Sequence, residues 1–186
     1  MVKKISAFFV VLGMNFFLCG FIYAQANVEL RLQNLENRVA QLEALQKAIV
    51  LPCSDLSAAL RATVGSKCKT SKGAVYERVN RDNFTEAWKG PEGMIWNGDN
   101  STAAYKHQDA IDFCNKKGGV LPSKEDLQKG EANGFREVLR MNYGFYWSST
   151  LVENDANKAH NMQASDGLMT FPSPRHYPYR ARCMAK

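Results

Sequence analysis

Metal-binding patterns are missing from this sequence, and histidine is scarce. The 186 residues include 3 histidines and 5 cysteines, with no C-x-x-C pair and no cluster of cysteine and histidine. Zinc in proteins is held by such clusters, so no zinc site is expected. The Glu-Pro-Asn and Trp-Asn-Asp signatures of calcium-binding lectins are missing from the late loops, and the oxygen-rich segment 153–157 is expected to be a solvated loop. We therefore expect neither a metal nor a cofactor.

The excess of positive charge in this sequence is too small for a dedicated nucleic-acid-binding protein. The whole chain has 24 Lys and Arg residues against 18 Asp and Glu. Two of the basic residues, Lys3 and Lys4, belong to an expected signal segment, which leaves 22 − 18 = +4 for the mature chain. Nucleic-acid-binding domains carry denser positive charge, so no nucleic-acid partner is expected.

Residues 1–26 have the three parts of a secretory signal: a lysine pair, an almost wholly apolar run over 5–23, and Ala24-Gln25-Ala26 at the cleavage positions. An uncleaved membrane anchor is the alternative, because the apolar run is nearly long enough to cross a bilayer. A polar residue within the run, together with the small residues after it, favours cleavage. We expect an exported chain that begins at Asn27, keeps no membrane span, and is periplasmic, surface-bound or secreted.

Cleavage would remove Cys19 and leave an even number of cysteines, which predicts two disulfides in an oxidising compartment. Four cysteines permit three pairings, and the sequence by itself does not choose between them. A short helix over 53–62 and a turn at 65–67 would bring Cys68 back to Cys53, and this bridge would close a collar over residues 52–73. The four cysteines are Cys53, Cys68, Cys114 and Cys183.

Neither glycine nor proline occurs between Asn27 and Leu51, where apolar residues recur at alternating spacings of four and three. This is the heptad pattern of a coiled coil, and it predicts a helical stalk over residues 27–51 that Pro52 ends. The d positions are Val28, Leu35, Leu42 and Ile49, and the a positions are Leu32, Val39 and the polar Gln46.

The stalk contains two consecutive copies of the pattern Arg-apolar-x-x-apolar-Glu, at residues 31–36 and 38–43. This pattern resembles the short trimerisation motif of coiled coils. An arginine at g can reach a glutamate at e of a neighbouring helix while its methylenes cover the apolar seam. We predict a parallel homotrimer; the alternative is one amphipathic helix packed on its own domain. The residues of the two copies are Arg31, Leu32, Leu35, Glu36, Arg38, Val39, Leu42 and Glu43.

Residues 74–186 are predicted to form an α+β domain with helices early and strands late. Short strands are expected at 74–79 and 94–96, and an amphipathic helix at 101–117. A second helical stretch should begin after a cap at Ser123 and run to about residue 141, with a turn at 132–134. Aromatic-rich strands are expected after that.

A series of short motifs occurs in order along this domain, at residues 93–96, 118–127, 146–150 and 182–184, with Ala110 and Cys114 between the first two. The series resembles the bacterial Lcl C-terminal domain family, which is similar to the C-type-lectin-like fold also used by formylglycine-generating enzymes. Val120 stands where that family usually has Trp-Arg before Leu-Pro. The resemblance implies a C-type-lectin-like head, and it implies a bridge between Cys114 and Cys183, which leaves Cys53 with Cys68.

Catalytic motifs are hard to find. Ser148 and Ser149 lack the glycine elbow of a hydrolase nucleophile, and His107 lies on the inward face of a predicted helix, as a core or interface histidine would. The cysteines have structural roles, and Trp96 and Trp147 are expected in the core. We expect no enzyme activity.

The best candidate for ligand binding is the late segment 171–180, in which prolines stiffen a chain rich in tyrosine and arginine. Tyrosines can stack on sugar rings, and arginines can make forked bonds to carboxylate or sulfate. The alternative is that the tyrosines plug the base of the domain and the arginines are solvated. The candidate ligand-binding residues are Lys158, Arg175, His176, Tyr177, Tyr179 and Arg180.

Together these features predict an exported homotrimeric adhesin or glycan-binding protein that recognises cell-surface or anionic polysaccharide without chemistry. Three heads on one stalk would turn weak sites into a multivalent display. The alternative is a structural envelope or periplasmic trimer whose heads bind other proteins.

Overall fold

The computed structural model describes residues 28–45, 50–98, 103–141, 143–170 and 172–185. The chain divides into two units, residues 1–46 and 47–186. The expected signal segment, residues 1–26, lies outside the described residues, as do Gln46 and Ile49 of the expected heptads. Across the described part of the chain, no helix is both long enough and apolar enough to span a membrane.

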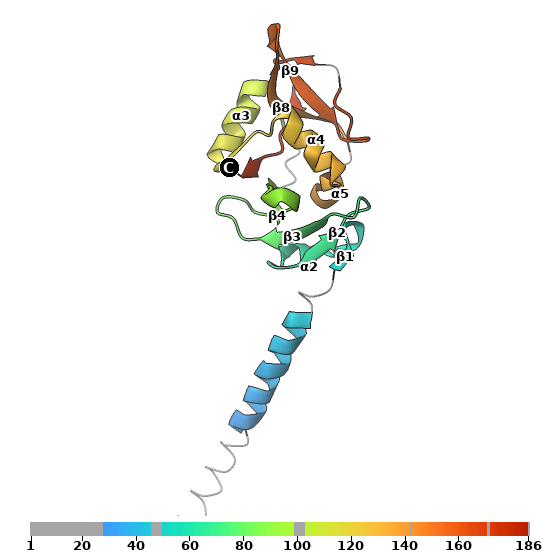
Figure 1. Ribbon diagram of the computed structural model, residues 1–186. Helices are drawn as coiled ribbons and strands as arrows, with labels where there is room; N and C mark the ends of the chain where they lie inside the picture. The colour runs from blue at the N-terminus through green and yellow to red at the C-terminus, as the bar shows by residue number, and fades with distance from the viewer. Residues whose placement is uncertain (1–27, 46–49, 99–102, 142, 171, 186) are drawn as a thin grey trace, which may run out of the picture. The chain divides into compact units, whose positions relative to one another are not determined.

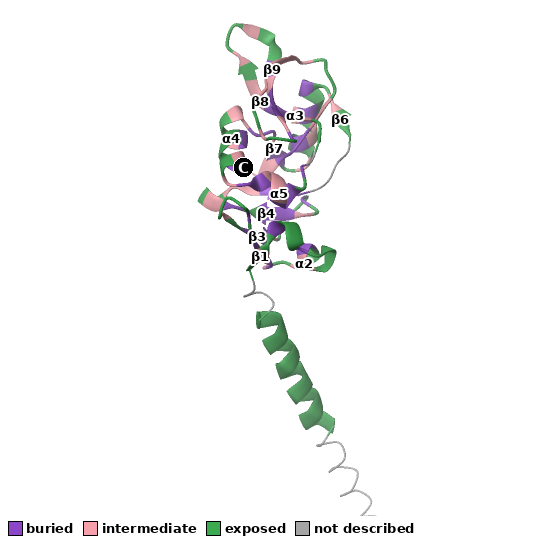
Figure 2. Ribbon diagram, turned by 90° about the vertical axis from the view of Figure 1, so that its right-hand side faces the viewer, coloured by how far each residue is buried: buried purple, intermediate pink, exposed green. Residues whose placement is uncertain are grey.

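The first unit contains one helix over residues 28–45, all of whose residues are exposed. Figure 2 shows this helix in the exposed colour along its whole described length. Its apolar stripe is therefore open to solvent: Leu35 is 56% exposed and Leu42 64% exposed. The predicted helix is confirmed over these residues, whereas the coiled coil and its three-stranded state stay predictions.

The second unit is a mixed α+β domain with two sheets, as expected (Figure 1). In the larger sheet, the four strands β2 to β5 follow one another as an antiparallel meander. The strand order is β1-β2-β3-β4-β5-β12-β7, so the C-terminal strand lies between two strands formed much earlier in the sequence. The strands are β1 (Val50–Pro52), β2 (Lys67–Lys69), β3 (Val75–Val79), β4 (Ala87–Lys89), β5 (Ile95–Asn97), β7 (Gly119–Val120) and β12 (Met184–Ala185).

The smaller sheet has the order β10-β9-β8-β11-β6 and is built on the long β8–β9 hairpin. In Figure 1 this hairpin, in orange and red, lies at the opposite end of the domain from β1 and β2. Strand β11 is parallel to β8 and antiparallel to β6. The strands are β6 (Ala104–Tyr105), β8 (Phe145–Val152), β9 (Asp155–Gln163), β10 (Ser173–Pro174) and β11 (Tyr179–Arg180).

The helices of the domain are short, and their ends are set by local chemistry. The side chain of Ser123 accepts a hydrogen bond from the Asp126 amide and the Asp126 carboxylate accepts one from the Ser123 amide, which confirms the expected cap. Gly134 has a left-handed backbone and separates two helices, which confirms the expected turn. The helices are α2 (Ala58–Ala62), α3 (His107–Lys116), α4 (Lys124–Ala132) and α5 (Phe135–Leu139), with 3-10 turns η1 (Cys53–Asp55) and η2 (Pro91–Gly93).

Three expectations for the head were wrong. The first long helix begins at His107 and not at residue 101, because Ala104 and Tyr105 form β6 by pairing with β11. The expected helix over 53–62 is broken into η1 and α2, because the backbone of Leu56 and of Ser57 is extended between them. Strands β1 to β5 also precede the helices α3 to α5, so helices are not segregated to the early part of the domain.

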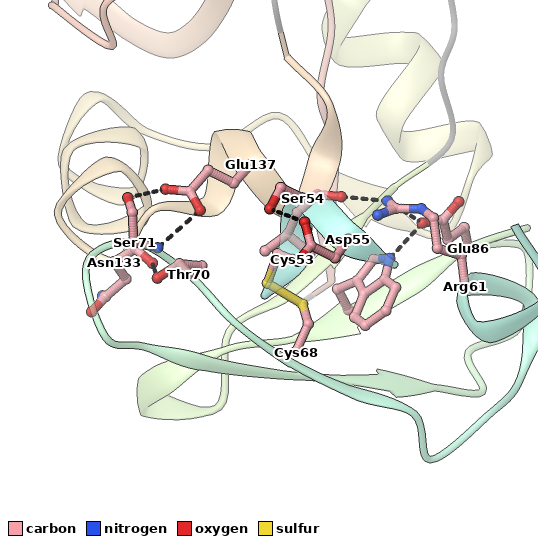
Figure 3. The surroundings of a disulfide bond; sticks show 12 residues. Cys53, Ser54, Asp55, Arg61, Cys68, Thr70, Ser71, Glu86, Asn133 and Glu137 are labelled. Atoms are coloured by element: carbon pink, nitrogen blue, oxygen red, sulfur yellow. Dashed lines mark hydrogen bonds and ion pairs between the residues drawn. A yellow bond between two sulfur atoms is a disulfide. The ribbon is translucent and has the colours of Figure 1, made fainter. Parts of the chain in front are cut away.

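Two disulfides are present, Cys53–Cys68 and Cys114–Cys183, which is the pairing expected for the mature chain. Figure 3 shows the first bridge, which joins η1 to β2. Two disulfides are consistent with an exported protein, since oxidising compartments preserve them. Trp96 and Trp147 are fully buried in two separate core clusters, which confirms their expected place.

Candidate functional site

The structure does not bring the six predicted ligand-binding residues together on one surface. Tyr179 and Arg180 are successive residues of β11, so their side chains point to opposite faces of the sheet. Tyr179 lies against Phe145 and Trp147, whereas Arg180 lies over the ring of Tyr143. The candidate region therefore consists of two small surfaces, one on each side of β11.

Tyr179 has a mainly structural role. Its ring centroid lies 4.6 Å from that of the buried Trp147 and 5.1 Å from that of Phe145. Its hydroxyl lies 3.1 Å from the hydroxyl of Ser173 on β10. For this tyrosine, the alternative that the late aromatic residues plug the domain describes the structure better than ligand binding.

Arg175 is held by groups of the domain itself. Its Nε donates to Nδ1 of the buried His107 at 3.2 Å, and its carbonyl oxygen accepts from the His107 amide at 2.9 Å. Its two terminal nitrogens lie within 3.3 Å and 3.4 Å of the Ala156 carbonyl and the Gln108 side chain. Arg175 thus joins the turn after β10 to the N-terminus of α3, and a ligand would have to compete for its donors.

Lys158 is also engaged, in an exposed ion pair. Its Nζ lies 3.1 Å from an Asp155 carboxylate oxygen, three residues earlier on β9, and side-chain hydrogen bonding to Lys158 lowers the pKa of Asp155. Exposed pairs of this kind contribute little to stability, so a polyanion could displace Asp155 at little energetic cost.

The first of the two surfaces consists of His176 and Tyr177, at the turn between β10 and β11. Both are exposed, Tyr177 to 44%, and their rings meet edge-on with centroids 4.9 Å apart. Tyr177 also meets Tyr179 edge-on at 6.2 Å, which ties it to the aromatic cluster below. Tyr177 therefore presents an exposed ring at this turn, and its contact with Tyr179 holds that ring in place.

The second surface is the Tyr143–Arg180 pair. The guanidinium carbon of Arg180 lies 4.0 Å from the centroid of the Tyr143 ring, which is close enough for a cation–π contact. Tyr143 is 58% exposed, and Arg180 is half-buried. A side-chain hydrogen bond with Tyr143 raises the pKa of Arg180, so the guanidinium keeps its charge.

Tyr143 was missed as a candidate residue. It precedes Gly144, whose backbone is left-handed, at the start of β8. Strand β8 pairs in parallel with β11 at Tyr146 and Arg180, and from this position the Arg180 guanidinium reaches the Tyr143 ring. An exposed tyrosine next to a turn glycine was the available signal, but its partner is fixed by strand pairing and could not be read locally.

The chain matches no protein-family model, no curated protein and no solved structure. The resemblance to the Lcl C-terminal domain family therefore depends on the sequence motifs alone and stays a prediction. Among the residues that the structure describes, no three His, Cys, Asp or Glu side chains are grouped so that they could hold a metal ion.

Proposed function

We propose that this chain is an exported, non-catalytic adhesin that binds anionic polysaccharide through three C-type-lectin-like heads of the Lcl C-terminal type on a coiled-coil stalk. The observation that carries the proposal is the Tyr143–Arg180 pair. An arginine stacked on one face of an exposed tyrosine offers a flat ring for a sugar and a guanidinium for its carboxylate or sulfate.

The position of this pair supports binding with little loss of entropy. Arg180 is part of β11 and Tyr143 flanks β8, so both are attached to paired strands and not to a long loop. The stacking contact also holds the guanidinium in place before a ligand arrives. Preorganised aromatic and arginine side chains are the usual energetic anchors of binding surfaces.

The exposed apolar stripe of the first unit supports the multivalent part of the proposal. Leu32, Leu35, Val39 and Leu42 are each more than half exposed on the helix over 28–45. Burying each such side chain between helices contributes about 1.5–3 kcal/mol, which drives association of helices with a heptad stripe. Three linked heads would then convert weak single-site affinity into avidity.

Glycan binding by the mature chain, residues 27–186, tests the proposal. Heparin and polygalacturonate serve as sulfated and carboxylated probes, and dextran as a neutral control, on a biosensor surface. We expect Arg180→Ala to weaken polyanion binding about tenfold or more, since three sites fail together. Lys89→Ala, which removes an exposed charge from β4, is the matched control and should bind like wild type.

Two results would count against the proposal: no polyanion binding at high surface density, or equal binding by Arg180→Ala and Lys89→Ala. Arg175→Ala distinguishes ligand contact from support. Because Arg175 is bonded to His107 and Ala156, its loss should lower thermal stability more than it lowers glycan binding.

The second candidate is a structural envelope or periplasmic trimer whose heads bind other proteins. It is favoured by the internal engagement of Arg175 and Tyr179, which leaves fewer free groups for sugar than the sequence predicted. A pull-down from envelope extract that recovers one protein, with no effect of added heparin or polygalacturonate, would support this candidate over the first.

A further inference from the structure

A pocket of about 280 Å³ opens in the second unit between α2, strand β3, the residues just before β4, and the end of α5. Three arginines and one glutamate line it, so its charged groups sum to 3 − 1 = +2. None of the residues discussed above as glycan contacts belongs to this lining. The lining residues are Ala58, Arg61, Ala62, Arg78, Thr85, Glu86 and Arg140.

Arg61 is the most buried of the three arginines, and its side chain is only 5% exposed. One terminal nitrogen donates to Glu86 Oε1 at 2.7 Å and also to the Val138 carbonyl, a bond pair that fixes the side chain (Figure 3). Its Nε has no hydrogen-bond partner among the described residues. A buried donor without an acceptor is unfavourable, so Arg61 has spare bonding capacity at the pocket wall.

Glu86 is the one carboxylate among the described residues of the pocket lining, and two donors share one of its oxygens. The same oxygen that receives Arg61 accepts a hydrogen bond from Nε1 of the buried Trp88 at 2.5 Å. The guanidinium of Arg61 lies 5.3 Å from the centre of the Trp88 ring. The pocket wall is therefore a rigid unit of three interlocked side chains.

Arg78 adds a second buried guanidinium with no carboxylate partner among the described residues. It is 7% exposed, and its nitrogens donate to four main-chain carbonyls. Carbonyl oxygens orient the guanidinium but do not cancel its charge. Arg78 is therefore a fixed positive charge behind the pocket.

Arg140 stands at the mouth, in a backbone conformation that disfavours it. It ends α5 with φ 53° and ψ 44°, the left-handed region in which glycine or asparagine is usual. It is exposed and forms no ion pair with any residue that the structure describes.

The three guanidinium groups also act on one another. Burial, followed by the charges of Arg140 and Arg78, lowers the pKa of Arg61, while Glu86 opposes the effect. An anion in the pocket would screen these like charges and supply an acceptor to Arg61 Nε. Guanidinium groups form their strongest bonds with planar or tetrahedral oxyanions.

We propose that the pocket bounded by Arg61, Arg78 and Arg140 binds an oxyanion, a carboxylate or sulfate, on a molecule no larger than about one monosaccharide. The volume sets the size limit, because pockets for drug-sized ligands begin near 300 Å³. The site is separate from the Tyr143–Arg180 pair and does not depend on the glycan-binding proposal. A single acidic sugar and an inorganic sulfate ion both offer an oxyanion to the guanidinium groups. Titration with each ligand distinguishes the two.

Isothermal titration of the mature chain with sodium glucuronate, sodium sulfate and glucose at low ionic strength tests the proposal. We expect saturable binding of glucuronate and none of glucose. Equal affinity for sulfate would assign the site to any oxyanion, and tighter binding of glucuronate would assign it to an acidic sugar. Either result supports an oxyanion site. Absence of saturable binding for both anions would overturn it.

Two variants of Arg140 separate binding from folding. Arg140→Gln removes the charge but keeps an unbranched polar side chain and a non-glycine residue in the left-handed backbone, and it should weaken anion binding about tenfold, the effect of losing one charge-assisted bond. Arg140→Gly should lose the same affinity while its melting temperature rises, because glycine relieves the left-handed strain. Lys89→Ala again controls for charge. Wild-type affinity in Arg140→Gln, beside an unchanged Lys89→Ala, would overturn the assignment.

Discussion

Nε2 of His107 lies 2.9 Å from the main-chain carbonyl oxygen of Ser148. Since a carbonyl oxygen only accepts, Nε2 must carry the hydrogen, and Nδ1 is then the acceptor for Arg175 Nε. The donation from Arg175 requires the neutral form of this buried ring. Burial most of all, and also the charge of Arg175, lower the pKa of His107, while its hydrogen bond to Ser148 opposes them.

This geometry predicts that the head loses stability in mild acid. The unfolded chain binds a proton at His107 near its ordinary pKa of 6.5, whereas the folded state resists protonation until lower pH. The free energy of unfolding should therefore be highest above pH 6.5 and should fall as the pH drops below it. Thermal unfolding at pH 7.5 and 5.5 measures the effect.

His107→Gln is the informative variant, because its amide can still donate toward Ser148 but does not titrate. Its melting temperature should fall less between the two pH values than that of wild type, by at least about 2 °C, the shift produced by roughly half a kcal/mol in a domain of this size. His160, whose pKa burial also lowers, is present in both proteins and cancels in the comparison. Equal falls would contradict the assignment.

The two disulfides are predicted to contribute unequally to stability. The Cys53–Cys68 bridge spans 15 residues and the Cys114–Cys183 bridge spans 69. On the chain-entropy model these loops correspond to about 3 and about 4 kcal/mol. Urea unfolding of the paired alanine variants should show the larger loss for the longer loop, and the reverse order would contradict this explanation.

Two glycines that both have a positive φ angle allow the effect of steric overlap to be separated from that of backbone strain. Gly73 has φ +87° with no atom within 4 Å of an added Cβ, whereas at Gly134, with φ +74°, an added Cβ would lie 2.8 Å from Cβ of Thr70. Gly73→Ala should destabilise the head by about 1–2 kcal/mol. Gly134→Ala should lose a further 1–3 kcal/mol, about the cost of overpacking. Chemical denaturation of the two variants measures the difference, and equal losses would show that Thr70 gives way freely.

The stalk prediction is tested by changing its apolar seam. Leu35→Gln combined with Leu42→Gln should convert a mass of three chains to that of one chain in sedimentation equilibrium, because the buried apolar seam would be lost. Asn34→Ala with Gln41→Ala, at the neighbouring c positions, is the matched control and should leave the mass unchanged. A single-chain mass for wild type would contradict the trimer.

Local signals in the sequence were sufficient for several elements of the fold. The Ser123 cap, the turn at 132–134 and the strands around Tyr76 and Trp96 each depend on neighbours a few residues away. The start of α3 could not be predicted in this way. Ala104 and Tyr105 lie next to residues with a helical sequence pattern, but they form a strand because β11, far along the chain, pairs with them.

The same limit applies to the candidate site. The sequence placed Tyr179 and Arg180 in one rigid loop, whereas their strand pairing sends one side chain into the core and the other to Tyr143. The arginine pocket went unnoticed because Arg61, Arg78 and Arg140 come from three segments without a shared motif. Non-local pairing decides which basic residues have neighbours of like charge, and no single segment contains that information.

The position of β12 has a consequence for how this domain is made. Met184 pairs with both Trp96 on β5 and Val120 on β7, so the larger sheet is incomplete until residues 184 and 185 have been synthesised. Before that moment the meander β2–β5 presents an open strand edge, and such edges recruit other chains. A nascent head is therefore most vulnerable to mispairing with a second copy late in its synthesis, and the Cys114–Cys183 bond can secure the correct partner only once that closing strand has arrived.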